Sequence, residues 1–217
     1  MGGSSWRGVN SSAMDAEFSV ELGTNAPALE LPWSSKDAQQ RFYDLRSRPE
    51  LLLEIPEAAN NRALGEFLTA INTPHGSLQT VKCDAWISSE ISEEEKVYGA
   101  AMKFGSYIDL VFTGDEPRQS MEAHEKFARS LCGLLGKAPS ISVAAEFILR
   151  RCYVHTAELA AGRLPQHDAP SDNSENAYCL SFYLTGYGDD EDDARKRWMI
   201  GLKLVENAIL QLAARGI

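Results

Sequence analysis

The sequence predicts an α+β protein in which helices pack on an antiparallel sheet. Some segments alternate polar and apolar residues, as half-buried strands do, and others carry apolar residues at helical spacing. The chain has 217 residues, of which 44% are hydrophobic, so it can bury one sizeable core. From residue 57 onward the expected order is α-β-β-β-α-β-β-α, preceded by an N-terminal strand and a short helix.

The chain divides into three predicted parts. Residues 1–13 are rich in Gly, Ser and Asn, lack periodicity and resemble a vector-derived leader, which makes Met14 a plausible native start. Residues 14–55 form an N-terminal extension, and residues 56–217 form a single α+β domain. Within that domain the polar segment 156–177 is predicted to be a mobile insertion in a hairpin.

The first third of the chain predicts a strand over 17–22 and a loop over 23–35. Residues 49–55 fit either a short buried strand or a short helix with Pro49 at its first position, and we favour the helix. A clearer helix is predicted over 56–72 from its apolar face, which consists of Leu64, Phe67, Leu68 and Ile71.

The middle of the chain predicts three antiparallel strands, over 80–89, 96–104 and 107–113. Gly105-Ser106 suits a type II′ hairpin turn between the last two. The alternative is one long strand with a glycine bulge at Gly105. Alternation places two sets of side chains on opposite faces: Ile108, Leu110 and Phe112, against Tyr107, Asp109 and Val111.

The last part predicts a helix over 115–136, strands over 143–155 and 178–187, and a final helix beginning near Asp189. In the strand over 143–155, one face carries Phe147, Leu149 and Tyr153, and the other Ile148, Cys152 and Val154. The final helix has the most regular apolar stripe of the chain: Trp198, Leu202, Val205, Ile209 and Leu212.

The charge balance excludes some classes of partner. The chain carries 21 Lys and Arg against 31 Asp and Glu, a formal net charge of −10. This surplus argues against nucleic acid and anionic membranes, since both are polyanions. No apolar run of about 18 residues and no signal sequence is present, so we expect a cytoplasmic protein. Without a nucleotide-binding or phosphate-binding motif, we expect no cofactor.

The acidic run 189–193 has two interpretations, a divalent-cation site or the first turn of a helix. We favour the helix start, because acids stabilise the free N–H groups there and basic residues follow one turn later. The segment that starts with His124-Glu125 begins like the two-histidine zinc-binding helix of metalloproteases. Ala128, however, occupies the position where that helix requires its second His. We therefore expect no metal site.

The cysteines Cys83, Cys132, Cys152 and Cys179 form no CxxC motif and are expected to be small buried hydrophobes. A catalytic thiol is the alternative, supported only by Arg150-Arg151 beside Cys152. An enzymatic site could also be assembled from distant residues, with Asp84 and Asp109 as a carboxylate pair for acid–base chemistry. The suspects for it are Asp84, Asp109, Arg151 and His155, although alternation favours solvent-facing positions for the two carboxylates.

Aromatic residues gather on the predicted strands. If helices cover one face of the sheet only, aromatic side chains on the open face mark a partner surface, whereas the alternative is that they complete the core. The candidates for partner binding are Trp86, Tyr98, Tyr107, Tyr153, Phe182 and Tyr187, and Tyr183 belongs to the same group.

The predicted element order from Glu57 to Ile217, together with the small size and acidity, resembles that of type III secretion chaperones and the related YbjN-like bacterial proteins. The resemblance rests on order and not on a motif. It implies a homodimer without catalytic residues that binds a segment of another protein. We accordingly expect a non-enzymatic protein-binding or chaperone-like module, the alternative being a small-molecule enzyme with the site named above.

Overall fold

The computed structural model describes residues 14–35, 40–156 and 174–216. The predicted leader and most of the predicted insertion over 156–177 lie outside this part of the chain.

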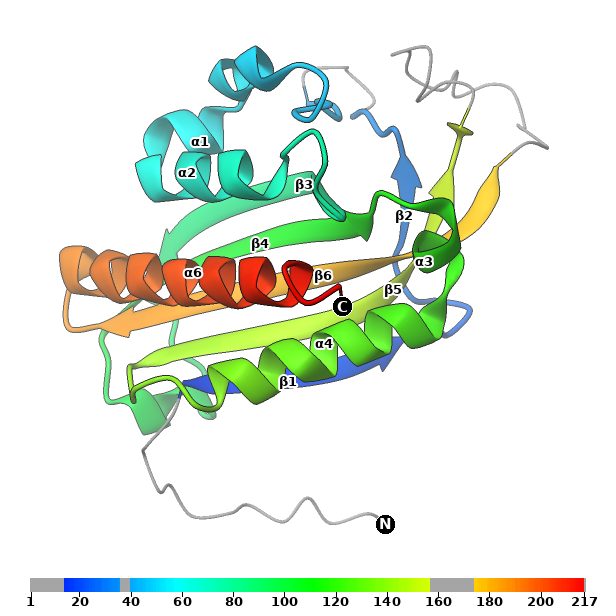
Figure 1. Ribbon diagram of the computed structural model, residues 1–217. Coiled ribbons are helices and arrows are strands. Elements are labelled where there is room, and N and C mark those ends of the chain that lie inside the picture. The colour runs from blue at the N-terminus through cyan, green and yellow to red at the C-terminus, as the bar shows by residue number, and fades with distance from the viewer. Residues whose placement is uncertain (1–13, 36–39, 157–173, 217) are drawn as a thin grey trace.

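The described residues form one six-stranded sheet with its helices on a single face (Figure 1). The strands are β1 (Asp15–Glu21), β2 (Ala28–Leu31), β3 (Leu78–Ser88), β4 (Met102–Phe112), β5 (Val143–Val154) and β6 (Glu175–Gly188). The helices are α1 (Pro56–Asn60), α2 (Arg62–Ile71), α3 (Asp115–Gln119), α4 (Met121–Leu135) and α6 (Glu191–Ala213), with 3-10 turns η1 (Pro49–Glu54) and η2 (Glu95–Tyr98).

The sheet confirms the α+β class and is mixed. Its order is β1-β5-β6-β4-β3, and β5, β6, β4 and β3 are antiparallel neighbours. β1 and β2 both run parallel to β5 and follow each other along one edge of it, pairing with residues 144–150 and 151–154. The part of the expected extension over 14–55 that holds β1 and β2 therefore belongs to the same sheet as the later strands. It covers an edge of β5 that would otherwise present unpaired backbone groups.

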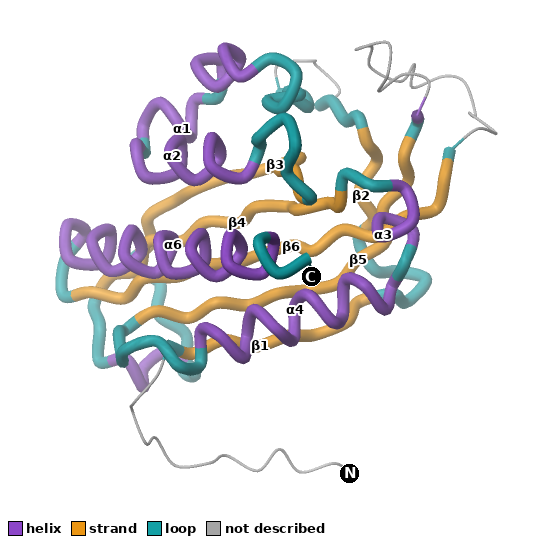
Figure 2. Tube along the Cα trace, in the orientation of Figure 1, coloured by secondary structure: helices purple, strands orange, loops and turns teal. Residues whose placement is uncertain are grey.

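The helices seal one face of the sheet, which we call the helix-covered face (Figure 2). α6 packs on β4 and β6, α4 on β1 and β5, and α2 on β3. The stripe predicted on α6 from Trp198 to Leu212 is buried, and so are the sheet residues that face it. The core of this face includes Phe104, Ile108, Leu110, Phe147, Leu180, Phe182 and Leu184.

The predicted hairpin at Gly105-Ser106 is wrong, because β4 runs unbroken through both residues and η2 replaces the start of the strand predicted over 96–104. Gly105 serves close packing instead of a turn. A Cβ there would lie 2.8 Å from the indole of Trp86 on β3. The long-strand alternative fits better, but the register shift lies in β3, between Thr80 and Lys82, and not at Gly105.

Two predicted helices are each broken once. The helix over 56–72 divides into α1 and α2 at Asn61, whose backbone is extended. The helix over 115–136 divides at Ser120, whose hydroxyl accepts a hydrogen bond from the amide of Ala123 and so caps α4. Ser and Asn compete for backbone hydrogen bonds in this way, and an apolar stripe does not reveal the break.

A second, smaller core closes one end of the opposite face. Here Trp33, just after β2, contacts β3: its indole Nε1 donates a hydrogen bond to the carbonyl oxygen of Val81 at 2.6 Å. Among the described residues, no α-helix packs on the rest of this face, and we call it the helix-free face. The small core consists of Leu31, Val81, Val111, Cys152, Val154, Ala177 and Cys179, with Leu29 and Phe42 against it.

Among the helices of the described residues, none is both long and apolar enough to cross a membrane.

Candidate functional site on the helix-free face

Alternate residues of neighbouring strands bring polar side chains together on the helix-free face. Lys82 on β3 lies opposite Asp109 on β4, and Asp109 lies opposite Ser181 on β6. One step along, Tyr107 lies opposite Tyr183. Side chains of paired residues stand on the same side of a sheet, so these five form one surface.

A hydrogen-bonded network fixes the centre of that surface. The hydroxyl of Ser181 donates to Oδ1 of Asp109 at 2.5 Å. Nη1 of Arg150 on β5 donates to the Ser181 hydroxyl at 3.2 Å and to the Tyr183 hydroxyl at 3.0 Å. The same guanidinium forms an ion pair with Glu21 on β1, 2.9 Å from Nη2 to Oε2. Arg150 therefore ties the edge strand to the middle of the sheet.

Asp109 is buried, and only 8% of its surface is exposed, so the expectation that it faces solvent is wrong. It does face away from the helices, as alternation predicts, but Ser181 and the small core surround it. Burial raises the pKa of its carboxyl, against the opposing influence of the Ser181 hydrogen bond and the positive charges of Lys82 and Arg150.

Lys82 differs from Arg150 in having no carboxylate partner among the described residues. Its ammonium lies over two aromatic rings, 5.1 Å from the centroid of Trp33 and 5.8 Å from that of Tyr107. Cation–π contacts of this kind hold the ammonium in place without using its N–H groups. Lys82 thus presents a positioned positive charge at the surface.

Lys82 and Tyr107 line two adjoining hollows. The first, the polar hollow, has a volume of about 160 Å³ and lies over β4, β5 and β6. Its polar lining consists of Lys82, Tyr107, Asp109, Arg150, Ser181 and Tyr183, and Pro27, Ala28 and Leu29 form its apolar side together with Cys179.

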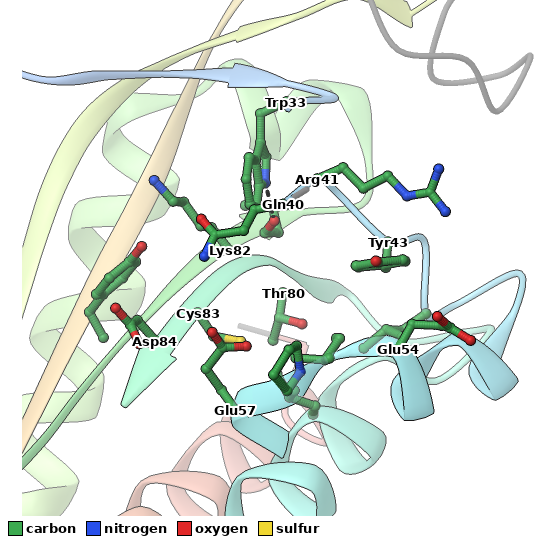
Figure 3. Close-up of a pocket in the computed structure, with 16 residues that line it drawn as sticks. Trp33, Gln40, Arg41, Tyr43, Glu54, Glu57, Thr80, Lys82, Cys83 and Asp84 are labelled. Atoms are coloured by element: carbon green, nitrogen blue, oxygen red, sulfur yellow. Dashed lines mark hydrogen bonds between the residues drawn. The ribbon is translucent and has the colours of Figure 1, made fainter. Parts of the chain in front are cut away.

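The second, the aromatic hollow, has a volume of about 130 Å³ and lies beside β3. Consecutive residues of β3, from Thr80 to Asp84, line it, which places it along the outer edge of that strand. Figure 3 shows Trp33 and Glu57 on opposite sides of the strand, with Thr80 and Cys83 between them. The other walls include Tyr43, Arg41, Leu45, Glu54, Ile55, Leu68 and Tyr107.

The thiol of Cys83 in the aromatic hollow is not activated. Burial, and then the negative charge of Glu57, raise its pKa to about 12. Burial likewise raises the pKa of Cys152 to about 12, and that of Cys179 well above its ordinary value. All four cysteines are unpaired, and Cys152 and Cys179 are buried. The prediction of small buried hydrophobes is confirmed for these two, and Arg150 binds Glu21 instead of activating Cys152.

The structure separates the aromatic candidates. Tyr107 and Tyr183 lie on the helix-free face, with ring centroids 5.9 Å apart. Trp86 lies on the same face nearer the end of β3, and 39% of its surface is exposed. Phe182 is fully buried on the helix-covered face, stacked 5.0 Å from Phe147, so its prediction as a partner-binding residue is wrong. Phe182 is buried because successive side chains of a strand point to opposite faces, and its neighbour Tyr183 points to the helix-free face.

The remaining aromatic candidates lie away from the hollows. Tyr187 is 3% exposed and stacks on Tyr98 at 4.0 Å between ring centroids. Tyr98 is in η2 and not in a strand, and its hydroxyl donates to Asp15. Tyr153 is half-buried on the same side of β5 as Phe147. Tyr98 and Tyr187 thus contact each other within the fold, and Tyr153 does not share a face with Tyr107 and Tyr183.

The four residues suggested for an enzymatic site do not form one group. Asp84 and Asp109 share the helix-free face and border the aromatic and the polar hollow, respectively. Arg151 points to the other side of β5 from Arg150, and it donates to the carbonyl oxygen of Leu22. His155 lies just beyond β5 and pairs with Glu30.

The acidic run starts α6, as predicted. Asp190 is the N-cap and accepts a hydrogen bond from the amide of Asp193 at 2.8 Å. Glu191 and Asp193 form ion pairs with Arg195 and Arg197 one turn later. Within the described ranges, no group of three or more His, Cys, Asp and Glu residues is arranged to hold a metal ion.

Sequence reasoning missed Lys82, Arg150 and Ser181, and it left Trp33 in a loop without a role. The signal for the first three was available: they occupy the same alternate positions as Tyr107 and Asp109 in their strands. The alternation of side chains within a strand does not show which strands are neighbours in the sheet. It therefore does not predict that Lys82, Arg150 and Ser181 lie close together. Trp33 lies outside any periodic segment and has no comparable signal.

Models of known protein families, curated proteins and solved structures were each compared with the chain, and none of them matches it. The site geometry therefore carries the functional argument.

Proposed function

We propose that this protein is a non-enzymatic binding module that holds a segment of a partner protein in two adjoining hollows, the polar hollow on its helix-free face and the aromatic hollow at the outer edge of β3. The observation that carries the proposal is that the hollows adjoin at Lys82 and Tyr107. The two hollows lie side by side, from the edge of β3 to the middle of the sheet, and we refer to them together as the groove. An aromatic part and a polar part lie next to each other in it, as recognition of a mixed polar and apolar segment requires.

The size of the hollows favours single side chains over a large cofactor. Their volumes are about 130 and 160 Å³. A cavity of about 150 Å³ holds one benzene ring, whereas pockets that enclose drug-sized ligands span about 300 to 1,000 Å³. Each hollow thus fits one amino-acid side chain.

The outer edge of β3 supports the same interpretation. Within the described part of the chain, β3 ends the sheet and no strand pairs with its outer side. An extended segment can add itself to such an edge through main-chain hydrogen bonds, while pockets beside the edge select its side chains. The aromatic hollow lies in that position. Binding of a partner segment is also what the resemblance to type III secretion chaperones implies.

A displayed library of random peptides tests the proposal. The wild-type protein is expected to enrich a peptide family, and Tyr107→Ala to weaken its binding by about tenfold or more, since buried aromatic anchors dominate such interfaces. Tyr153→Ala is the matched control, a half-buried tyrosine on the other side of the sheet, and it is expected to bind as the wild type does. Thermal unfolding of each variant checks the fold.

Two results contradict the proposal. One is that no peptide is enriched, and the other is that Tyr107→Ala retains the enriched peptides. A second copy of this chain could also occupy the groove, as in the homodimer expected from the resemblance. Light scattering tests this by measuring the mass of the protein in solution. A mass of twice 23.9 kDa that Tyr107→Ala reduces to one chain would assign the groove to that copy in place of another protein.

A further inference from the structure

The polar hollow contains hydrogen-bond donors that the fold does not use. The ammonium of Lys82 has three N–H groups and contacts only aromatic rings among the described residues. The hydroxyl of Tyr107 forms no hydrogen bond within the same part of the chain. Burial first, and then the charge of Asp109, raise the pKa of Tyr107, so that its hydroxyl keeps its proton at neutral pH. The Tyr183 hydroxyl accepts from Arg150, which leaves its own proton to donate.

Arg150 holds this arrangement in place and is itself occupied. Nε and Nη2 bind Glu21, and Nη1 binds Ser181 and Tyr183. A guanidinium engaged on three sides orients its neighbours and adds little unpaired charge. Among the described residues that line the hollow, Lys82 is therefore the cation without an ion pair, while the acidic lining residue, Asp109, is buried and accepts a hydrogen bond from Ser181.

A single positive charge with nearby hydroxyl donors matches a carboxylate. A phosphate group carries nearly two negative charges at neutral pH and would need a second unpaired cation. The surroundings are also acidic, because Glu17, Glu21 and Glu146 face the same side along β1 and β5. The repulsion among these carboxylates, which contributes after burial to raising the pKa of Glu146, disfavours polyanions.

From this geometry we propose that the polar hollow binds a carboxylate group, held by the ammonium of Lys82 and the hydroxyls of Tyr107 and Tyr183. The inference rests on the proposed function, because the carboxylate would anchor the bound partner segment. Two sources share the chemistry: an Asp or Glu side chain, and the carboxylate at the end of a chain.

Titrations followed by backbone amide NMR, at constant ionic strength, test the inference with four probes. N-acetylglycine represents a chain terminus, and N-acetylglutamate N-methylamide represents an acidic side chain. The uncharged glutamine counterpart and inorganic phosphate complete the set. We expect one or both carboxylate probes to shift the amide signals of Lys82, Asp109 and Ser181 saturably, with the tighter of the two identifying the source.

Substitution at the proposed anchor provides the second part of the test. Lys82→Met is expected to weaken carboxylate binding by about tenfold, the size of a lost charge-assisted hydrogen bond. Tyr107→Phe, which keeps the ring, is expected to weaken it by a smaller factor. Lys126→Met removes the same charge from an exposed position of α4 and is the matched control. The amide spectra of the unbound variants report whether each remains folded.

The outcomes separate this inference from the proposed function. Equal binding of the glutamate and glutamine probes, tighter binding of phosphate, or unchanged binding by Lys82→Met overturns the carboxylate site. Peptides that Tyr107→Ala loses but Lys82→Met retains would then leave the binding module standing without its anchor. Carboxylate binding with no enriched peptide would instead contradict the role in holding a partner segment.

Discussion

The two faces of this sheet are built from the same strands and differ in what covers them. On the helix-covered face, α2, α4 and α6 bury an almost wholly apolar layer. On the helix-free face, the small core at one end gives way to the Asp109–Ser181–Arg150 network and the polar hollow, and the aromatic hollow adjoins it at the outer edge of β3. The alternation of side chains separates the two environments by one residue, as Phe182 and Tyr183 demonstrate.

The comparison indicates a division of tasks between the faces. Apolar burial under the helices is expected to supply most of the stability, because buried apolar area is the dominant favourable contribution to folding. The helix-free face then tolerates polar groups and an open groove. The substitutions below test that division and are given in order of decreasing effect on stability.

Trp198→Ala is expected to lower the free energy of unfolding most, by about 3 to 5 kcal/mol. Trp198 is 1% exposed, its ring lies 4.7 Å from that of Phe104, and its Nε1 donates to the Ser106 hydroxyl at 2.8 Å. Urea unfolding measures the loss. Met199→Ala, at the exposed neighbouring position, serves as the control and is expected to change it by less than about 0.5 kcal/mol. Similar values for the two would contradict the division.

Gly186→Ala is expected to be the next most damaging change, at about 1 to 3 kcal/mol. A Cβ at this position of β6 would lie 2.4 Å from the backbone nitrogen of Trp198 and 2.5 Å from the carbonyl oxygen of Ala194. Gly133→Ala on α4 is the matched substitution with open space around it, and it is expected to stabilise by up to about 1 kcal/mol. Thermal melts of both variants should therefore move in opposite directions.

Asp109→Asn tests the helix-free face through pH. Burial raises the pKa of the Asp109 carboxyl, so the folded state binds the proton more tightly than the unfolded chain. The resulting stabilisation is complete below the unfolded value of about 3.9 and is lost as pH rises through the folded-state pKa. The stability of Asp109→Asn relative to wild type should therefore increase from acid to neutral pH.

Urea midpoints of both proteins, measured from pH 4 to 8, give this difference. A relative stability that falls with rising pH would show instead that the ionised carboxylate stabilises the fold through Lys82 and Arg150. Asp84→Asn removes the same charge from an exposed position of β3 and is expected to alter the midpoints less.

Lys82→Met is expected to have the smallest effect on stability, within about 0.5 kcal/mol, because the ammonium has no ion pair to lose among the described residues. Chemical denaturation measures it. A loss of several kcal/mol would place Lys82 in the support of the fold and would break the separation between a stabilising face and a binding face.

Much of the fold follows from local pattern. The strands over 17–22, 143–155 and 178–187 and the final helix were predicted close to their observed bounds, because each carries a strong period of two or 3.6. Gly105 misled the prediction, since a glycine fits a hairpin turn as well as a close approach to an aromatic ring. The two roles of a glycine can be told apart only when the residue on the neighbouring strand is known, which for Gly105 is Trp86 on β3.

The candidate site was predictable in part. Tyr107 and Asp109 were identified as lying on the opposite face from Ile108, and Tyr183 was among the strand aromatics. The prediction of an enzymatic site names Arg151, whereas Arg150 is the arginine on the same side of its strand as Cys152. The burial of Asp109 is not apparent from the sequence, because Leu29, Leu31 and Phe42, which belong to the small core or pack against it, lie where the sequence has weak periodicity.

Local sequence pattern is enough to predict which side chains share a face of each strand and that the acids of 189–193 start a helix. These properties depend on residues only a few positions apart. The tertiary structure alone decided that β1 and β2 pair with β5, and that Lys82, Asp109, Arg150 and Ser181 meet. Strand order depends on how distant segments pack against one another, and this non-local packing creates the two hollows.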